Sequence, residues 1–152
     1  MSLPNSSLIR VANVLNSGVA VLTGTTIGTL GSNTNGTTIY TAGSEGGRVM
    51  SLMGSTNDTV TVNAFIYILR GVTVLPVALV NIPLSAGNFN STVRAVVDFL
   101  NGSNIPGLPI DNTGRQYIPL MPNDVLRATT VANLSGGAAA WLVAHGQDYR
   151  TL

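Results

Sequence analysis

Residues 57–71, NDTVTVNAFIYILRG, alternate between two faces of an extended chain, and this pattern restricts the fold more than any other segment. One face has only aliphatic side chains: Val60, Val62, Ala64, Ile66 and Ile68. A period of two, rich in β-branched and aromatic residues, predicts a β-strand. Gly71 ends the strand, and residues 72–84, VTVLPVALVNIPL, follow at hairpin distance. Pro76 cannot donate a ladder hydrogen bond, so we expect a bulge or a sheet edge there.

Six further strand segments are separated by turn-forming residues. They are residues 18–23, 37–42, 47–55, 117–121, 124–133 and 138–146. The turns between strands contain Gly, Asn, Asp and Ser, as in TLGSNTNG, AGSEGG, DNTG and LSGG. These residues adopt the backbone angles of tight turns at low cost. Eight short strands at this spacing predict a sandwich or a barrel.

Residues 90–102, NSTVRAVVDFLNG, break the alternation. Asn90 or Ser91 can cap a helix, apolar residues recur at helical spacing, and Gly102 can end it. We therefore predict a helix of about three turns that covers an open end of the sandwich. The predicted fold is all-β, a jelly-roll-like β-sandwich or barrel of about eight strands with one short helix. Residues 18–152 form a single domain, and residues 1–17 are either an arm ordered by a partner or a first strand.

Only 9% of the residues are charged, against about 25% in typical soluble domains. The basic residues are all arginines, and the net charge is +1. A chain without a basic patch is a poor partner for nucleic acid. Low net charge instead favours packing against other protein surfaces. There is no cysteine for a disulfide or a thiolate site, residues 1–18 do not read as a signal peptide, and no apolar run is long enough for a membrane span.

No set of residues predicts catalysis or a cofactor. Several of the six carboxylates stand in predicted turns, where we expect them to hydrogen-bond the backbone. His145, the one histidine, shares a strand face with Trp141 and Val143, which indicates a packed or rim residue and not a metal ligand. No nucleophile elbow or phosphate-binding loop is present. The DNTG segment has one Asp, too few for calcium, so we expect a turn with Gly114 at positive φ.

The C-terminal half resembles small structural proteins of tailed bacteriophages and prophages. Residues 108–127 match a LPxDxxGxxxxPLxxxxxLR hairpin, and residues 146–149 match a Gly-x-Asp-Tyr tail. The segment GGRVMSLMGSTNDTVTVNAFIYILRG is similar to their central strand pair. The resemblance implies a decoration, or cement, protein on the outer surface of the phage head, often a homotrimer. Its partners would be the major capsid protein and further copies of itself, with no cofactor and no catalytic residue.

Arginine and tyrosine are enriched at protein interfaces, which gives the residues expected to contact the capsid or a neighbouring subunit: Arg10, Arg48, Arg94, Arg115 and Tyr117. The apolar N-terminal arm could add a strand to a neighbour. Two other interpretations stay open. One is a tail, baseplate or head–tail joining protein, and the other is a jelly-roll carbohydrate-binding module. A glycan site would be favoured if Trp141 were exposed beside Tyr149.

Overall fold

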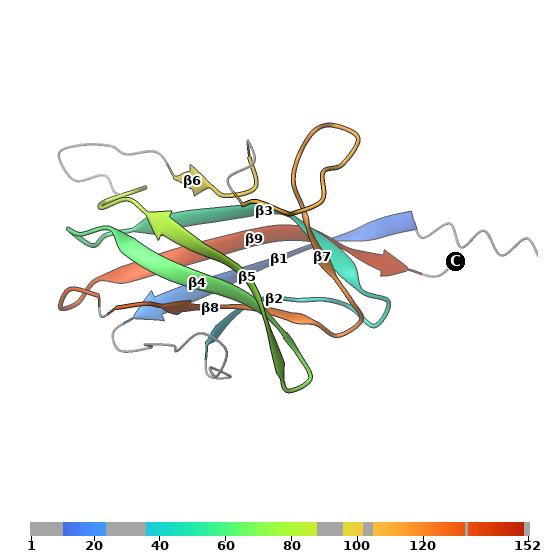
Figure 1. Ribbon diagram of the computed structural model, residues 1–152, viewed down its shortest axis with the longest axis horizontal. Coiled ribbons are helices and arrows are strands. Elements are labelled where there is room, and N and C mark those ends of the chain that lie inside the picture. Colours follow the sequence, from blue (N-terminus) through green and yellow to red (C-terminus); the bar gives the residue numbers. More distant parts are fainter. Residues whose placement is uncertain (1–10, 24–35, 88–95, 102–104, 133, 151–152) are drawn as a thin grey trace, which may run out of the picture.

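The protein is an all-β sandwich, as the alternation predicts. The computed structural model describes residues 11–23, 36–87, 96–101, 105–132 and 134–150, and these residues contain strands but no helix. Two antiparallel sheets lie face to face (Figure 1). The strands are β1 (Val11–Thr23), β2 (Thr37–Thr41), β3 (Gly47–Thr56), β4 (Val62–Arg70), β5 (Thr73–Ile82), β6 (Val97–Asp98), β7 (Ile118–Leu120), β8 (Val125–Thr130) and β9 (Ala139–Arg150).

The strand pairs are nested inside one another. Strands β4 and β5 form the innermost pair, followed outward by β3 with β6, β2 with β8, and β1 with β9. This is the pairing of one long antiparallel hairpin. Two further pairs, β9 with β3 and β8 with β4, roll it into sheets of order β1-β9-β3-β6 and β2-β8-β4-β5. The short β7 pairs with the start of β3, beside β6 on the same edge.

The predicted helix is wrong where the structure describes it. Val97 and Asp98 form strand β6 against Gly54 and Met53 of β3. The backbone N–H of Phe99 donates to the carbonyl of Leu52, and the Phe99 ring lies against Gly54. These contacts with a strand distant in the sequence outweigh the helical preference that the spacing of the apolar residues predicts. A short run of β-branched residues fits a buried strand as well as one face of a helix, so the spacing alone does not decide between them. Residues 90–95 and 102 of the predicted helix lie outside the described residues.

The core lies between the sheets and follows the predicted alternation. Its largest fully buried aliphatic side chains are Leu22, Ile39, Leu52, Ile66, Ile82, Leu100, Ile118, Leu126 and Leu142. In β4 the opposite face is buried as well: Phe65 and Tyr67 stack with ring centroids 5.6 Å apart. The Tyr67 hydroxyl accepts a hydrogen bond from the backbone N–H of Gly36. Both faces of β4 are therefore covered at its centre, which the alternating pattern alone does not indicate.

Strand β5 confirms the expectation for Pro76. It is an edge strand, and the ladder shifts register between Ile66 and Tyr67, opposite Ala78 and Pro76. The proline thus lies beside a bulge, where a missing N–H costs little. Proline and bulges also protect a sheet edge against pairing with another chain.

The two sheets approach each other most closely where β1 passes β2. Residues 11–17 form the first half of β1, paired with β9, and residues 1–10 lie outside the described residues. Gly18 of β1 lies against the carbonyl oxygen of Ile39 in β2, and a Cβ atom on Gly18 would overlap that oxygen. A residue without a side chain is needed at this position because two backbones meet there.

Replacing Gly18 should therefore destabilise the protein. We expect Gly18→Ala to lower the free energy of unfolding by about 2–3 kcal/mol, because β1 must move away from β2. Urea denaturation followed by circular dichroism measures this change. Gly136→Ala is the control, since a Cβ atom there meets nothing within 4 Å. Equal stability of the two variants would contradict the close approach of β1 and β2.

Candidate interaction surface

The loop of residues 105–117 projects from the sandwich beside β3 and is drawn in orange in Figure 1. Its base is fixed by the buried side chain of Gln116. The Gln116 amide donates to the carbonyl of Ile105 at 2.6 Å and accepts from the Ile105 N–H at 3.5 Å. An isolated bridge between Ile110 and Gln116 starts the hairpin above this base. The loop is thus held at a fixed position on the sheet.

The turn at the tip of the loop confirms the expected role of Asp111. One oxygen of its carboxylate accepts hydrogen bonds from the Thr113 N–H at 2.9 Å, the Thr113 hydroxyl at 2.7 Å and the Arg115 N–H at 3.0 Å. The Thr113 hydroxyl, followed by the Arg115 N–H, lowers the pKa of Asp111. Gly114 has φ 83°. The DNTG segment is therefore a capped turn.

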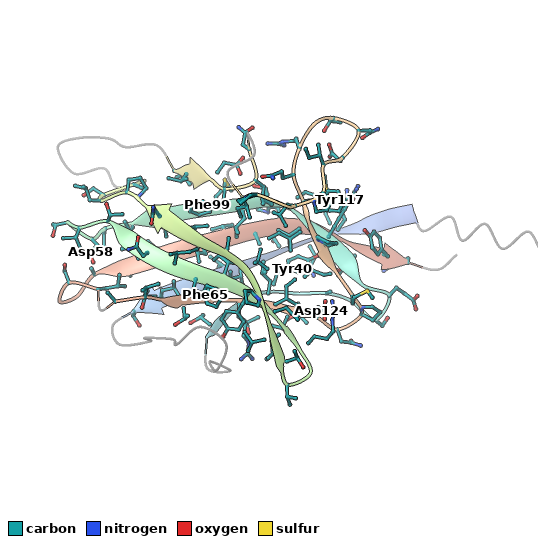
Figure 2. The ribbon with its side chains drawn as sticks, in the orientation of Figure 1. Tyr40, Asp58, Phe65, Phe99, Tyr117 and Asp124 are labelled. Carbon is teal, nitrogen blue, oxygen red and sulfur yellow. The ribbon has the colours of Figure 1, made fainter. Side chains whose placement is uncertain are left out.

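Arg48, Arg115 and Tyr117 come together around this loop. The guanidinium of Arg48, in β3, lies 5.7 Å from the centroid of the Tyr117 ring and donates to the Gln147 side chain at 3.0 and 3.3 Å. The side chain of Arg115 is 55% exposed and lies 3.6 Å from the carboxylate of Asp98. Figure 2 shows Tyr117 at the base of the loop.

We call Arg48, Ile110, Arg115 and Tyr117 the hairpin surface. Ile110 belongs to it because its side chain is 57% exposed near the tip of the loop. Arg10 and Arg94, the other two residues expected at an interface, lie outside the described residues. The hairpin surface combines one exposed aliphatic residue, one aromatic ring and two guanidinium groups, which is the composition of an interface core.

Asp58 is fully buried and joins two distant turns. Its carboxylate accepts hydrogen bonds from the Ser135 N–H at 2.9 Å and hydroxyl at 2.6 Å, and from the Val60 N–H at 3.2 Å. Burial by itself would raise the pKa of Asp58, but the hydrogen bonds from Ser135 and Val60 outweigh it, and the pKa is lowered. Asp58 therefore links the start of β4 to the turn before β9.

Asp124, toward the opposite end of the sandwich in Figure 2, is almost completely buried. It forms a two-point ion pair with Arg70, with distances of 2.9 and 2.7 Å, and accepts the Met121 N–H at 2.8 Å. The hydrogen bond from Arg70 is the main reason that the pKa of Asp124 is lowered. This ion pair could not be predicted from local patterns, because its members are 54 residues apart in the sequence.

Asp148 links both sheets. Its carboxylate accepts hydrogen bonds from the Tyr40 hydroxyl at 2.8 Å, the Asn16 amide at 3.1 Å and the Gly43 N–H at 3.2 Å. Burial, and then this carboxylate, raise the pKa of Tyr40 well above its usual value. Asp58, Asp124 and Asp148 thus serve the fold, and no group of three or more metal-ligating side chains occurs within the described ranges.

His145 is exposed, so the expectation of a packed or rim histidine is wrong. It occupies an outward position of β9, between Ser17 of β1 and Ser51 of β3, at the centre of the outer face of its sheet. The inward positions of β9 hold smaller or aliphatic residues, among them Leu142 and Ala144. The alternation was read correctly, but it does not tell which face is covered.

Trp141 is half-buried and lines a pocket of about 270 Å³. The other lining residues are Ser55, Thr56, Asn57, Ala86 and Gly87. Tyr149 lies eight residues further along β9, a distance of roughly 26 Å in a strand. The two aromatic residues therefore do not form one platform for a glycan.

No protein-family model matches the chain, and no curated protein shows significant similarity to it. Within the part of the chain that the structure describes, there is no helix with the length and hydropathy of a membrane span.

The lowered pKa values predict a loss of stability in acid. A folded-state pKa below the unfolded value of about 4 means that Asp58 and Asp124 stabilise the fold above that pH. This contribution disappears as the pH falls through the folded values. We expect the free energy of unfolding, measured with urea, to change little from about pH 7 to 5 and to fall below about pH 4.

The variants Asp58→Asn and Asp124→Asn test the origin of this effect. Each should lower stability at pH 7 by about 2 kcal/mol, because hydrogen bonds to a buried charge are lost. Each should also show a shallower decline in acid than the parent protein. An unchanged acid profile in the double variant would assign the decline to other carboxylates.

Proposed function

We propose that the protein is a structural component of a tailed-phage virion, a decoration protein that binds the outer surface of the head and stabilises the shell. The main observation behind this proposal is the distribution of charge. Asp58, Asp124 and Asp148 are used inside the fold, while many aliphatic side chains are exposed. The most exposed of these are Leu15, Val19, Val60, Val72, Leu79, Ile110 and Met121. Such a molecule is suited to contact with other proteins, and we assign it no reaction.

The nested strand pairing supports a finer description of the fold as a jelly roll. Apart from β7, the pairs β1–β9, β2–β8, β3–β6 and β4–β5 correspond to a single rolled-up hairpin. Jelly rolls occur in viral capsid proteins and in lectins, so this description supports a virion protein without selecting it. The resemblance of residues 108–127 to phage hairpins is the second support.

The hairpin surface is our proposed contact with the major capsid protein. The loop is anchored by Gln116, so it loses little conformational freedom when it binds. A protein that binds the assembled shell and not its separate subunits stabilises the shell by mass action. Many copies on one head would multiply this effect.

Copy number in particles tests the proposal. Phage particles purified from cells that express the gene should contain the protein at on the order of hundreds of copies per head, quantified by mass spectrometry against the major capsid protein. A tail, baseplate or joining protein would instead form a ring of about a dozen copies or fewer. Absence of the protein from particles would refute any virion role.

Two variants test the hairpin surface. Tyr117→Ala should weaken binding to heads that lack the protein by tenfold or more, and Arg115→Gln by a few fold, because buried aromatic residues contribute most to interfaces. Val72→Gln is the control, since Val72 is 89% exposed at the tip of the β4–β5 hairpin, which points away from the loop in Figure 1. Cosedimentation with heads measures the affinity. If all three variants bind as the parent does, another surface contacts the capsid.

A carbohydrate-binding module is the second candidate, favoured by the polar pocket beside Trp141. An indole next to hydroxyl and amide groups suits a pyranose ring. Binding on a glycan array that is lost in Trp141→Ala would support this function. No binding to any glycan on the array would remove it.

A further inference from the structure

The outer face of strands β1, β9 and β3 is a largely apolar surface, and no strand in the described part of the chain packs over it. The strand registers place outward side chains in rows across the three strands. One row contains Val19, Val143 and Met53, and the next contains Val21, Trp141 and Ser55. A third row, Ser17, His145 and Ser51, is polar but has no carboxylate or arginine. We call these three rows the β9 face.

Its aliphatic residues are unusually exposed for a sheet surface. Val19 is 56% exposed and Val21 42%, while Leu15, in the adjoining row of β1, is 82% exposed. The inward residues of the same strands, Ala20 and Leu22, are fully buried. The exposure therefore belongs to one side of the sheet and not to a frayed strand.

Charged groups border the β9 face but do not enter it. On the β6 side, Asp98 is paired with Arg115 at 3.6 Å. In the row of Leu15, Arg48 is held by Gln147 and Tyr117. None of the nine side chains in the three rows is a carboxylate or an arginine.

We propose that the β9 face binds the β9 face of a second copy of this chain. A charged partner would lose hydration on this surface without gaining an opposite charge, whereas a second β9 face meets no unpaired charge. The net charge of +1 adds almost no repulsion between copies. Two twisted sheets of the same hand pack face to face at about −30°, with their side chains interdigitated.

The size of the face sets the expected affinity. With the adjoining row of Leu15 included, three strands spaced about 4.8 Å apart, over eight residues at about 3.3 Å each, give a patch of about 400 Å². Stable interfaces bury about 800 Å² on each partner, and weaker ones about 600 Å² or less. We therefore expect a dimer with a dissociation constant in the micromolar range.

A contact between identical faces is isologous and limits the assembly to two copies. It differs from the three-fold arrangement that the phage resemblance implies. The proposal does not depend on a virion role, because the contact is between free copies of the chain. Failure of the dimer and absence from particles are separate results.

Sedimentation equilibrium of the full chain tests the proposal. We expect a species of twice the 15.7 kDa chain mass at concentrations above about 10 µM. Val19→Asp, which puts a charge in the middle row of the contact, should raise the dissociation constant at least tenfold. Val72→Asp is the matched control, since Val72 is more exposed and lies in the turn between β4 and β5 of the other sheet. A monomer at about 200 µM, a trimer, or equal effects of both variants would overturn the proposal.

Cysteine cross-linking gives a test that does not require a destabilising charge. The chain has no cysteine, so Val143→Cys introduces a single thiol at the middle of the β9 face. Mild oxidation should convert this variant into a covalent dimer, whereas Val72→Cys at the same concentration should stay largely monomeric. Equal yields from the two variants, or no dimer from Val143→Cys, would show that the β9 faces do not meet.

Discussion

The close approach of β1 and β2 joins the two sheets of the sandwich. β1 ends one sheet and β2 ends the other, so their contact closes one side of the sandwich. At this corner the lack of a side chain on Gly18 leaves room for the backbone of Ile39. The carboxylate of Asp148 accepts a hydrogen bond from the hydroxyl of Tyr40 in the opposite sheet. A larger residue at Gly18 would separate the strands, and the hydrogen bond between the sheets would be lost with them. The corner therefore combines a steric requirement with a polar one.

The chain has few charged residues, and several of them are used inside the fold. Asp58 connects segments 77 residues apart in the sequence, and Asp124 connects the end of β4 to the turn before β8. At each place a turn leaves backbone N–H groups that the sheets cannot satisfy, and a buried carboxylate accepts from them. Such groups are costly to remove, and their burial leaves fewer charges on the outer surface. The same residues that hold the fold thus account in part for its sparsely charged exterior.

Much of the fold could be predicted from the sequence, because strand alternation and turn residues are local signals. All eight predicted strands are present, and Gly114 and Pro76 lie where turn and edge chemistry require. The errors concern long-range contacts. Phe99 forms its contacts with β3 and not within a helix, and the cover over Phe65 and Tyr67 cannot be read from their spacing.

For the hairpin surface, the sequence predicted the types of residue but not how they are arranged. Arginine and tyrosine are common at interfaces, but nothing in their spacing places Arg48 of β3 over the Tyr117 ring. Likewise the alternation of β9 separates His145 from Leu142 without showing which of the two is exposed. That choice depends on which sheet face receives the second layer, a property of the whole topology.

The edges of the sheets decide how copies of this protein can associate. At one edge, β5 contains Pro76 beside a bulge, and at the corner the edge strands β1 and β2 lie close together. None of these edges therefore favours pairing with a long added strand. Strand β3 pairs with β7 and β6 along the side opposite β9. Association by strand addition, which the sequence suggested for the N-terminal arm, therefore finds few open edges among the described residues. Faces and loops are left as contact surfaces. The hairpin surface and the β9 face are adjacent, because Arg48 of the hairpin surface lies with Gln147 in the row next to the β9 face.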